Sequence, residues 1–117
     1  MKVKENGISA FIFEWNTLEE AVHELAVSKG WWEKERNKGE ALALIHAEIS
    51  ECLEALREEH KLSEKARGFS CVEEELADVV IRIMDFARGF NYDVAGAIEA
   101  KFEYNTGRPY KHGNKKF

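Results

Sequence analysis

Proline, cysteine and long apolar segments are all scarce in this sequence of 117 residues. It contains one proline and two cysteines, and no run approaches the roughly 18 apolar residues that a membrane-spanning helix requires. Residues 1–6 lack the apolar core of a secretory signal peptide. We therefore expect a soluble, cytoplasmic protein without a membrane partner. The content of 44% hydrophobic and 33% charged residues is typical of a compact helical domain rather than a disordered chain.

The two cysteines, Cys52 and Cys71, do not form a metal-binding C-x-x-C pair, and we expect both to be reduced thiols. Positive charge is also in the minority, and the net charge of −5 disfavours nucleic acid as a specific partner. The exception is the end of the chain, where five lysine or arginine residues from Lys101 onward accompany a single glutamate. Residues 106–117 are therefore predicted to be a basic tail on an acidic body.

Apolar residues recur with helical spacing in four segments, and capping signals mark where these segments begin. Thr17 and Ser70 each precede a glutamate by three residues, which is the capping-box pattern of a helix start. The predicted helices span residues 17–30, 39–60, 70–89 and 93–105. Residues 1–16 are predicted to be an ordered lead-in that packs on these helices. The whole chain, 1–117, is then one all-α domain, a bundle of about four helices.

The apolar surface of the two central helices indicates how they are buried. Within residues 39–60, the carboxylates Glu48 and Glu51 lie beside an apolar stripe and should border the core. That stripe consists of Leu42, Ile45, Ile49, Leu53 and Leu56. Within residues 70–89, Ile81 lies about 160° around the helix from Ile83. A helix that is apolar on two sides is buried on two sides, which in so short a chain indicates a subunit interface.

Two pairs of carboxylates lie within these central helices, Glu48 with Glu51 and Glu75 with Asp78. A spacing of three residues places both members of a pair on one helix face, where like charges repel unless a cation lies between them. Because the connection between the two helices is short, we expect them to be antiparallel and the pairs to converge. Burying four uncompensated carboxylates would be very costly. The pattern therefore favours a site for a hard divalent cation such as Mg²⁺ over a solvated acidic surface.

The same residues carry a resemblance to a known family. Glu48-x-x-Glu51 and Glu75-x-x-Asp78, separated by 23 residues, resemble the metal-binding signature of the MazG-like all-α nucleoside triphosphate pyrophosphatases. The likeness extends over residues 17–112. It implies a helical bundle that assembles as a homodimer or homotetramer. It also implies hydrolysis of a nucleoside (deoxy)triphosphate to the monophosphate and pyrophosphate, with the four acidic residues holding Mg²⁺, or Mn²⁺ in its place.

The expected hydrolysis and the family resemblance together predict roles for further residues. Mg²⁺ can neutralise a triphosphate and activate water, and Glu51 or Glu75 is the predicted acceptor of the water proton. The resemblance implies that residues near the end of the last helix contact phosphates, provided that the helix persists that far. One of two adjacent tryptophans is expected to stack on a nucleobase and the other to anchor helix packing. The predicted substrate-binding residues are Trp31, Trp32, Lys101, Asn105, Arg108, Tyr110 and Lys111. Arg82 is expected to pair with Asp78, four residues before it.

Two other classes of protein are weighed against this interpretation of the sequence. A di-iron carboxylate bundle needs two E-x-x-H motifs, and only Glu20-x-x-His23 fits. A non-enzymatic helical dimerisation or regulatory module is the more serious alternative; it needs no cation, so its stability should not depend on Mg²⁺. Within the family, a relative specialised for phosphoribosyl-ATP is less supported. The sequence does not specify the base or the sugar of the substrate.

Overall fold

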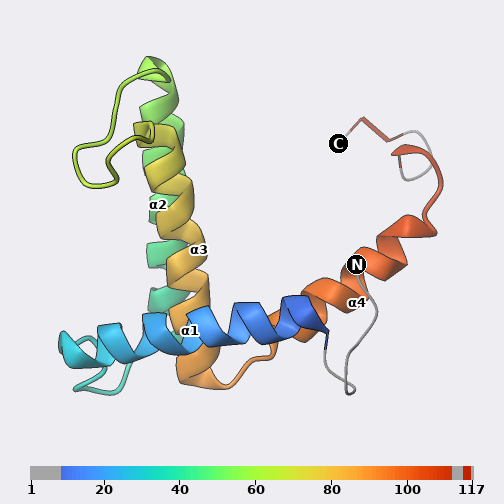
Figure 1. The fold of residues 1–117 in the computed structure, drawn as a ribbon, viewed down its shortest axis with the longest axis horizontal. Helices are drawn as coiled ribbons and strands as arrows, with labels where there is room; N and C mark the ends of the chain where they lie inside the picture. Colours follow the sequence, from blue (N-terminus) through green and yellow to red (C-terminus); the bar gives the residue numbers. More distant parts are fainter. Residues whose placement is uncertain (1–8, 112–114, 117) are drawn as a thin grey trace.

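The computed structural model describes residues 9–111 and 115–116, and these contain four α-helices. They are α1 (Ala10–Ser28), α2 (Lys38–Ala55), α3 (Cys71–Phe90) and α4 (Val94–Thr106), with a 3₁₀ turn at Leu56–Glu58. In Figure 1, α2 and α3 form an antiparallel pair, α1 crosses the base of this pair, and α4 leads away from it. The prediction of an all-α protein with four helices is confirmed. No helix in the described ranges is long and apolar enough to span a membrane.

Side-chain caps fix the start of each helix. Ser70 and Glu73 form the predicted capping box of α3, and the predicted cap Asp93 accepts a hydrogen bond from the Gly96 amide at 2.9 Å. The predicted start of the first helix at Thr17 is wrong. The helix begins at Ala10, capped by Ser9, and the Thr17 hydroxyl donates to the carbonyl of Phe13 at 2.8 Å inside it. Residues 10–16 of the predicted lead-in are therefore helical, and residues 1–8 lie outside the described part.

A glycine with positive φ and a 3₁₀ turn determine where the first two helices end. Gly30, the predicted stop of α1, has a φ of 90°, which ends the helix soon after Ser28. The second helix ends earlier than the predicted residue 60, because α2 tightens into the 3₁₀ turn after Ala55. The third continues to Phe90, one residue beyond the prediction, and the last ends at Thr106.

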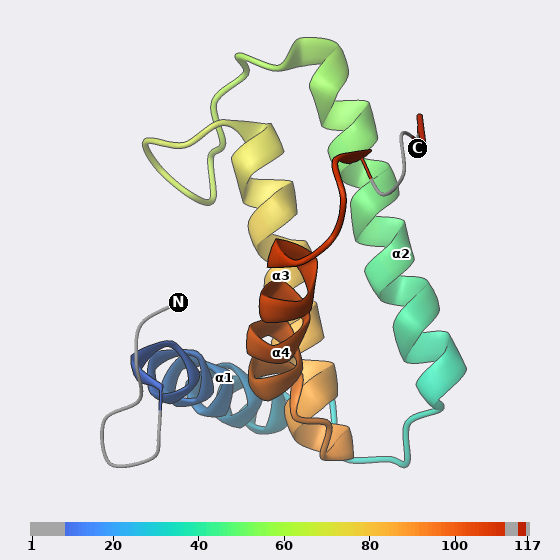
Figure 2. The ribbon, with the colours of Figure 1, turned by 90° about the vertical axis from the view of Figure 1, so that its right-hand side faces the viewer.

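The packing of α3 organises the chain. It contacts α2 along its length and α1 near its end, while α4 contacts α1 (Figure 2). Small side chains such as Ala41 on α2 and Ala87 on α3 are buried and let the helices approach closely. A Cβ atom at Gly89 would lie 2.1 Å from the Trp32 ring, so this tryptophan packs directly on the α3 backbone. Trp32 is thus the tryptophan that anchors helix packing.

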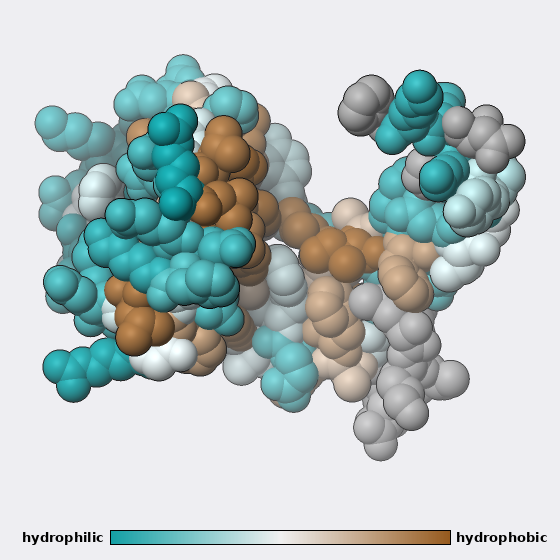
Figure 3. Space-filling model, turned by 90° about the horizontal axis from the view of Figure 1, so that it is seen from above, coloured by the Kyte–Doolittle hydropathy of each residue, from teal (hydrophilic) through white to brown (hydrophobic). Residues whose placement is uncertain are grey.

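Most of the apolar stripe of α2 lies outside this core, although Ile45 is half-buried. Leu42, Ile49 and Leu53 are 52%, 51% and 67% exposed, because α2 meets α3 through smaller residues such as Ala41 and Cys52. In the described part of the chain, α3 is the helix that packs along α2. Figure 3 shows apolar side chains gathered on the side of the pair that faces α4 across a hollow. The stripe therefore borders solvent in a single chain, which corrects the expectation that it lies in the core.

Candidate metal centre

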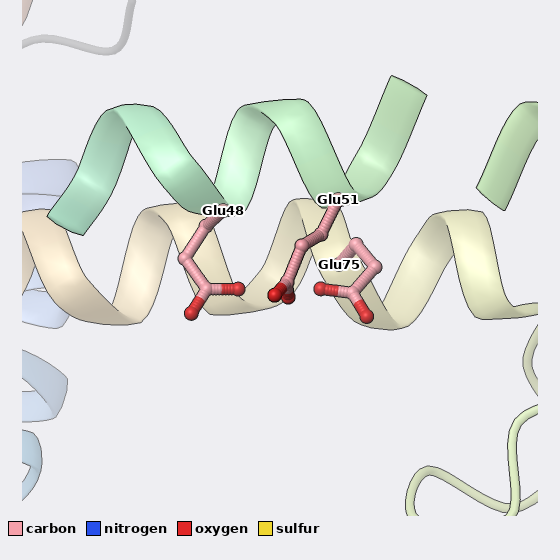
Figure 4. A group of neighbouring side chains, drawn as sticks. All are labelled: Glu48, Glu51 and Glu75. Atoms are coloured by element: carbon pink, nitrogen blue, oxygen red, sulfur yellow. The ribbon is translucent and has the colours of Figure 1, made fainter. Parts of the chain in front are cut away.

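The antiparallel pairing of α2 and α3 brings the predicted carboxylates together. Glu48, Glu51 and Glu75 point toward one another between the two helices (Figure 4). One oxygen from each lies within 4.8 Å of the others, a spacing that suits shared coordination of one ion. The convergence predicted from the two pairs is confirmed for these three residues.

Asp78 belongs to a second, overlapping group. Oxygens of Glu74, Glu75 and Asp78 also lie within 4.8 Å of one another, so Glu75 is common to both groups. Glu74 was not among the residues predicted from the sequence. The signal was present, however, because Glu74 precedes Asp78 by four residues and so shares its helix face. We call these five residues, Glu48, Glu51, Glu74, Glu75 and Asp78, the carboxylate cluster.

Protein donors hold two members of the cluster in place. Arg82 donates from Nε to Glu48 Oε1 at 2.8 Å, and Ser63 donates from its hydroxyl to Glu74 Oε1 at 2.5 Å. The predicted pair of Arg82 with Asp78 is wrong, because the arginine reaches across to α2 rather than along α3. Such contacts orient carboxylates in the way that outer hydrogen bonds orient metal ligands.

Two oxygens of the cluster are buried without a partner. Glu48 Oε2 and Glu75 Oε2 are both shielded from solvent and accept no hydrogen bond among the described residues. A buried carboxylate oxygen that accepts nothing is costly. The cost disappears when a cation binds there, and a set made only of carboxylate oxygens suits Mg²⁺ or Mn²⁺. The residues present therefore fit the predicted ion.

The electrostatics of the cluster lead to the same conclusion. Burial, together with the charges of Glu51, Asp78, Glu48 and Glu74, raises the pKa of Glu75 from 4.5 to about 7. Burial and the charges of Glu48 and Glu74 likewise raise the pKa of Asp78, although Arg82 and Lys65 act in the opposite direction. Without a cation, the Glu75 carboxyl is partly protonated near neutral pH. A bound divalent cation would keep it ionised.

The cluster opens into a cavity of about 520 Å³, within the range of small-molecule sites. The C-terminal part of α1 supplies an apolar wall, which Trp31 and Ile81 extend. Trp31 is 63% exposed, so of the two adjacent tryptophans it is the one available to a ligand. The cationic residues that line the cavity are Lys29, Arg36, Lys65 and Arg82.

A network around Asp85 supports the end of the cavity away from the cluster. The Asp85 carboxylate accepts from Trp32 Nε1 at 3.0 Å and from Arg36 at 3.3 Å, and His23 Nδ1 lies 2.8 Å from it. The guanidinium of Arg36 also lies over the Trp32 ring, 4.7 Å from its centre. This network was not predicted from the sequence, because its members come from three separate segments.

The predicted phosphate contacts are not brought to the cluster within one chain. Because α4 ends at Thr106, Arg108 does not continue the helical face of Lys101 and Asn105. None of these residues, nor Tyr110 or Lys111, lines the cavity. In Figure 1 the last turns of α4 point away from the helix pair that carries the carboxylates. Their assignment as substrate contacts stays a prediction.

Comparison with models of known families, with curated proteins and with solved structures finds no match to this chain. The fold and the site describe the protein in structural terms. It is an all-helical protein in which five carboxylates from an antiparallel helix pair border a partly apolar cavity.

Proposed function

We propose that this chain is a Mg²⁺-dependent nucleoside triphosphate pyrophosphohydrolase of MazG-like type. The observation that carries the proposal is the carboxylate cluster, in which two buried oxygens lack a partner beside a cavity large enough for a nucleotide. The resemblance of the two E-x-x-E/D motifs adds the substrate class. Hydrolysis of noncognate or excess nucleotides, a housekeeping role in the cytoplasm, is the corresponding biological purpose.

Glu48, Glu51, Glu75 and Asp78 are the proposed ligands of Mg²⁺, with Glu74 beside them. The ion would neutralise the triphosphate and increase the acidity of water in the site. In the overall reaction a water oxygen attacks the α-phosphorus, and the bond from this phosphorus to the bridging oxygen breaks. The electron pair leaves with pyrophosphate, and Glu51 or Glu75 accepts the proton of the water.

The proposed functional unit is a homodimer or homotetramer. The exposed leucine and isoleucine stripe of α2 supports this assembly, because a second copy would remove it from water. In such an assembly Lys101, Asn105 and Arg108 of one chain would contact the phosphates bound by the carboxylates of another. This arrangement reconciles the predicted phosphate contacts with their distance from the cluster in a single chain.

The first test is pyrophosphate release from a panel of ribo- and deoxynucleoside triphosphates, with Mg²⁺ and with EDTA. We expect Mg²⁺-dependent formation of monophosphate and pyrophosphate, loss of turnover in Glu51→Gln, and normal turnover in Glu54→Gln. Glu54 is a matched control, because it lies on the same helix but is exposed and pairs with Arg57 at 3.3 Å. Turnover by Glu51→Gln at the wild-type rate would remove the proposed metal assignment.

A non-enzymatic dimerisation module is the second candidate, and the exposed stripe on α2 also favours it. The two candidates differ in their response to metal. An enzyme with this cluster is stabilised by Mg²⁺, whereas a module whose function is only association is not. Absence of turnover on every nucleotide, together with a melting temperature that Mg²⁺ does not change, would select the module.

A further inference from the structure

The loop between α2 and α3 is closed at its base by backbone hydrogen bonds. Leu62 pairs with Ser70 as an isolated antiparallel bridge, and the Cys71 amide donates to the Lys61 carbonyl at 2.8 Å. The Ser63 amide donates to the carbonyl of Phe69, also at 2.8 Å. The residues between these contacts therefore form a turn of fixed geometry beside the start of α3.

A single side chain ties this turn to the carboxylate cluster. Ser63 is buried, and its hydroxyl oxygen accepts from the amides of Lys65 at 3.2 Å and Ala66 at 2.8 Å. The same hydroxyl donates to Glu74. The backbone of Lys65 is thereby placed relative to the cluster by two hydrogen bonds in series.

Lys65 borders the cavity of the carboxylate cluster without an ion-pair partner of its own in the described part of the chain. Lys65 lines the same cavity as the cluster, and its charge acts on Asp78. No ion pair of Lys65 shorter than 4.0 Å occurs in the described part of the chain. By contrast, Arg36 pairs with Asp85 at 3.3 Å and Arg82 with Glu48 at 2.8 Å.

The order of residues along α3 defines two different ends of the cavity. Glu74 and Asp85 are 11 residues apart on α3, so their positions are separated by about 16 Å along the helix. The loop with Lys65 lies at the Glu74 end, and the C-terminal end of α1, which leads to Trp31, lies at the other (Figure 1). A bound nucleotide would place its base against the apolar end and its terminal phosphates toward the loop.

We propose that Lys65 is a phosphate-binding residue that contacts the β- and γ-phosphates, which leave as pyrophosphate. The inference rests on the proposed function and adds an orientation of the substrate. When the bond from the α-phosphorus breaks, the bridging oxygen keeps the electron pair and gains negative charge. The Lys65 ammonium stabilises this charge and transfers no proton.

The test compares two lysines at opposite ends of one cavity. Lys65→Ala and Lys29→Ala each remove one positive charge, and Lys65→Arg restores it. Binding of pyrophosphate and of a nucleoside monophosphate to each variant is measured by calorimetry with Mg²⁺ present. We expect Lys65→Ala to weaken pyrophosphate binding about tenfold to a hundredfold, with little change for the monophosphate. Lys65→Arg should recover most of the affinity, and Lys29→Ala should bind pyrophosphate like the wild type.

Each outcome bears on the inference. Unchanged pyrophosphate binding in Lys65→Ala, or a loss confined to Lys29→Ala, would overturn it even if the wild type hydrolyses nucleotides. A Lys65-dependent affinity in a protein without turnover would support the phosphate contact and refute the proposed hydrolysis. Equal Mg²⁺ affinity in Lys65→Ala and the wild type is required, since a lost metal site would mimic a lost phosphate contact.

Discussion

Replacement of Glu75 by glutamine should stabilise the metal-free protein at neutral and alkaline pH. Glu75 belongs to both carboxylate groups, and burial together with four neighbouring carboxylates raises its pKa from 4.5 to about 7. Glutamine keeps the shape of the side chain but carries no charge. The substitution thus removes repulsion that the folded chain otherwise tolerates.

The size and the pH dependence of this effect follow from the linkage between ionisation and folding. Below pH 4.5 the Glu75 carboxyl is protonated in both the folded and the unfolded chain, so the substitution changes little. As pH rises toward 7 the unfolded chain loses the proton first, and the folded wild type is increasingly penalised. The rise from 4.5 to about 7 corresponds to about 3 kcal/mol of unfolding free energy. Because water reaches part of this side chain, we expect about 1–2 kcal/mol.

Urea denaturation in EDTA at several pH values from 4.5 to 8 measures this difference. The free energy of unfolding of Glu75→Gln should equal that of the wild type at the lowest pH and exceed it by the expected amount at pH 8. Glu54→Gln serves as the control, because Glu54 is exposed on the neighbouring helix. With Mg²⁺ the order should reverse, since only the wild type keeps the full ligand set. A Glu75→Gln variant that is less stable at pH 8 in EDTA would refute the reasoning.

Three further outcomes follow. Mg²⁺ at a hundred times its dissociation constant should raise the unfolding free energy of the wild type by about 2.7 kcal/mol. The increase for Glu51→Gln should be clearly smaller, and denaturant midpoints measure both. Gly89→Ala should cost about 1–3 kcal/mol, because its Cβ would meet the Trp32 ring. Gly107→Ala should be near neutral in the same assay, because its φ is negative and its Cβ would make only an ordinary contact with the Tyr104 carbonyl oxygen at 3.7 Å. If chains share sites, mixing inactive Glu51→Gln with inactive Arg108→Ala should restore about a quarter of wild-type activity, and no recovery would place Arg108 outside the partner's site.

The sequence was sufficient for the elements whose signals are local. The capping boxes and apolar periods predicted four helices, and Ser70 and Asp93 do cap α3 and α4. The same capping pattern was misleading at Thr17, because a threonine followed by glutamate also occurs inside helices. The true cap, Ser9, has Ile12 rather than a glutamate three residues later, so its signal was weak.

Contacts between helices set the limit of prediction at the site. The convergence of Glu48, Glu51 and Glu75 was predictable from two i, i+3 pairs on adjacent antiparallel helices. The partner of Arg82 was not, because the spacing along α3 offers Asp78 while the packing of α2 on α3 offers Glu48. Which tryptophan anchors the fold depended on the close approach to Gly89, a contact between distant segments.

The exposed stripe and the carboxylate cluster are two consequences of how α2 is rotated. Successive residues on a helix point about 100° apart, so Glu48 and Cys52 can face α3 only if Ile49 and Leu53 face away. The rotation that presents these carboxylates to α3 therefore leaves Ile49 and Leu53 uncovered. An apolar interface would then accompany the cluster whether or not the protein is an enzyme. Oligomerisation alone cannot distinguish the two proposed functions, whereas the response of the cluster to Mg²⁺ can.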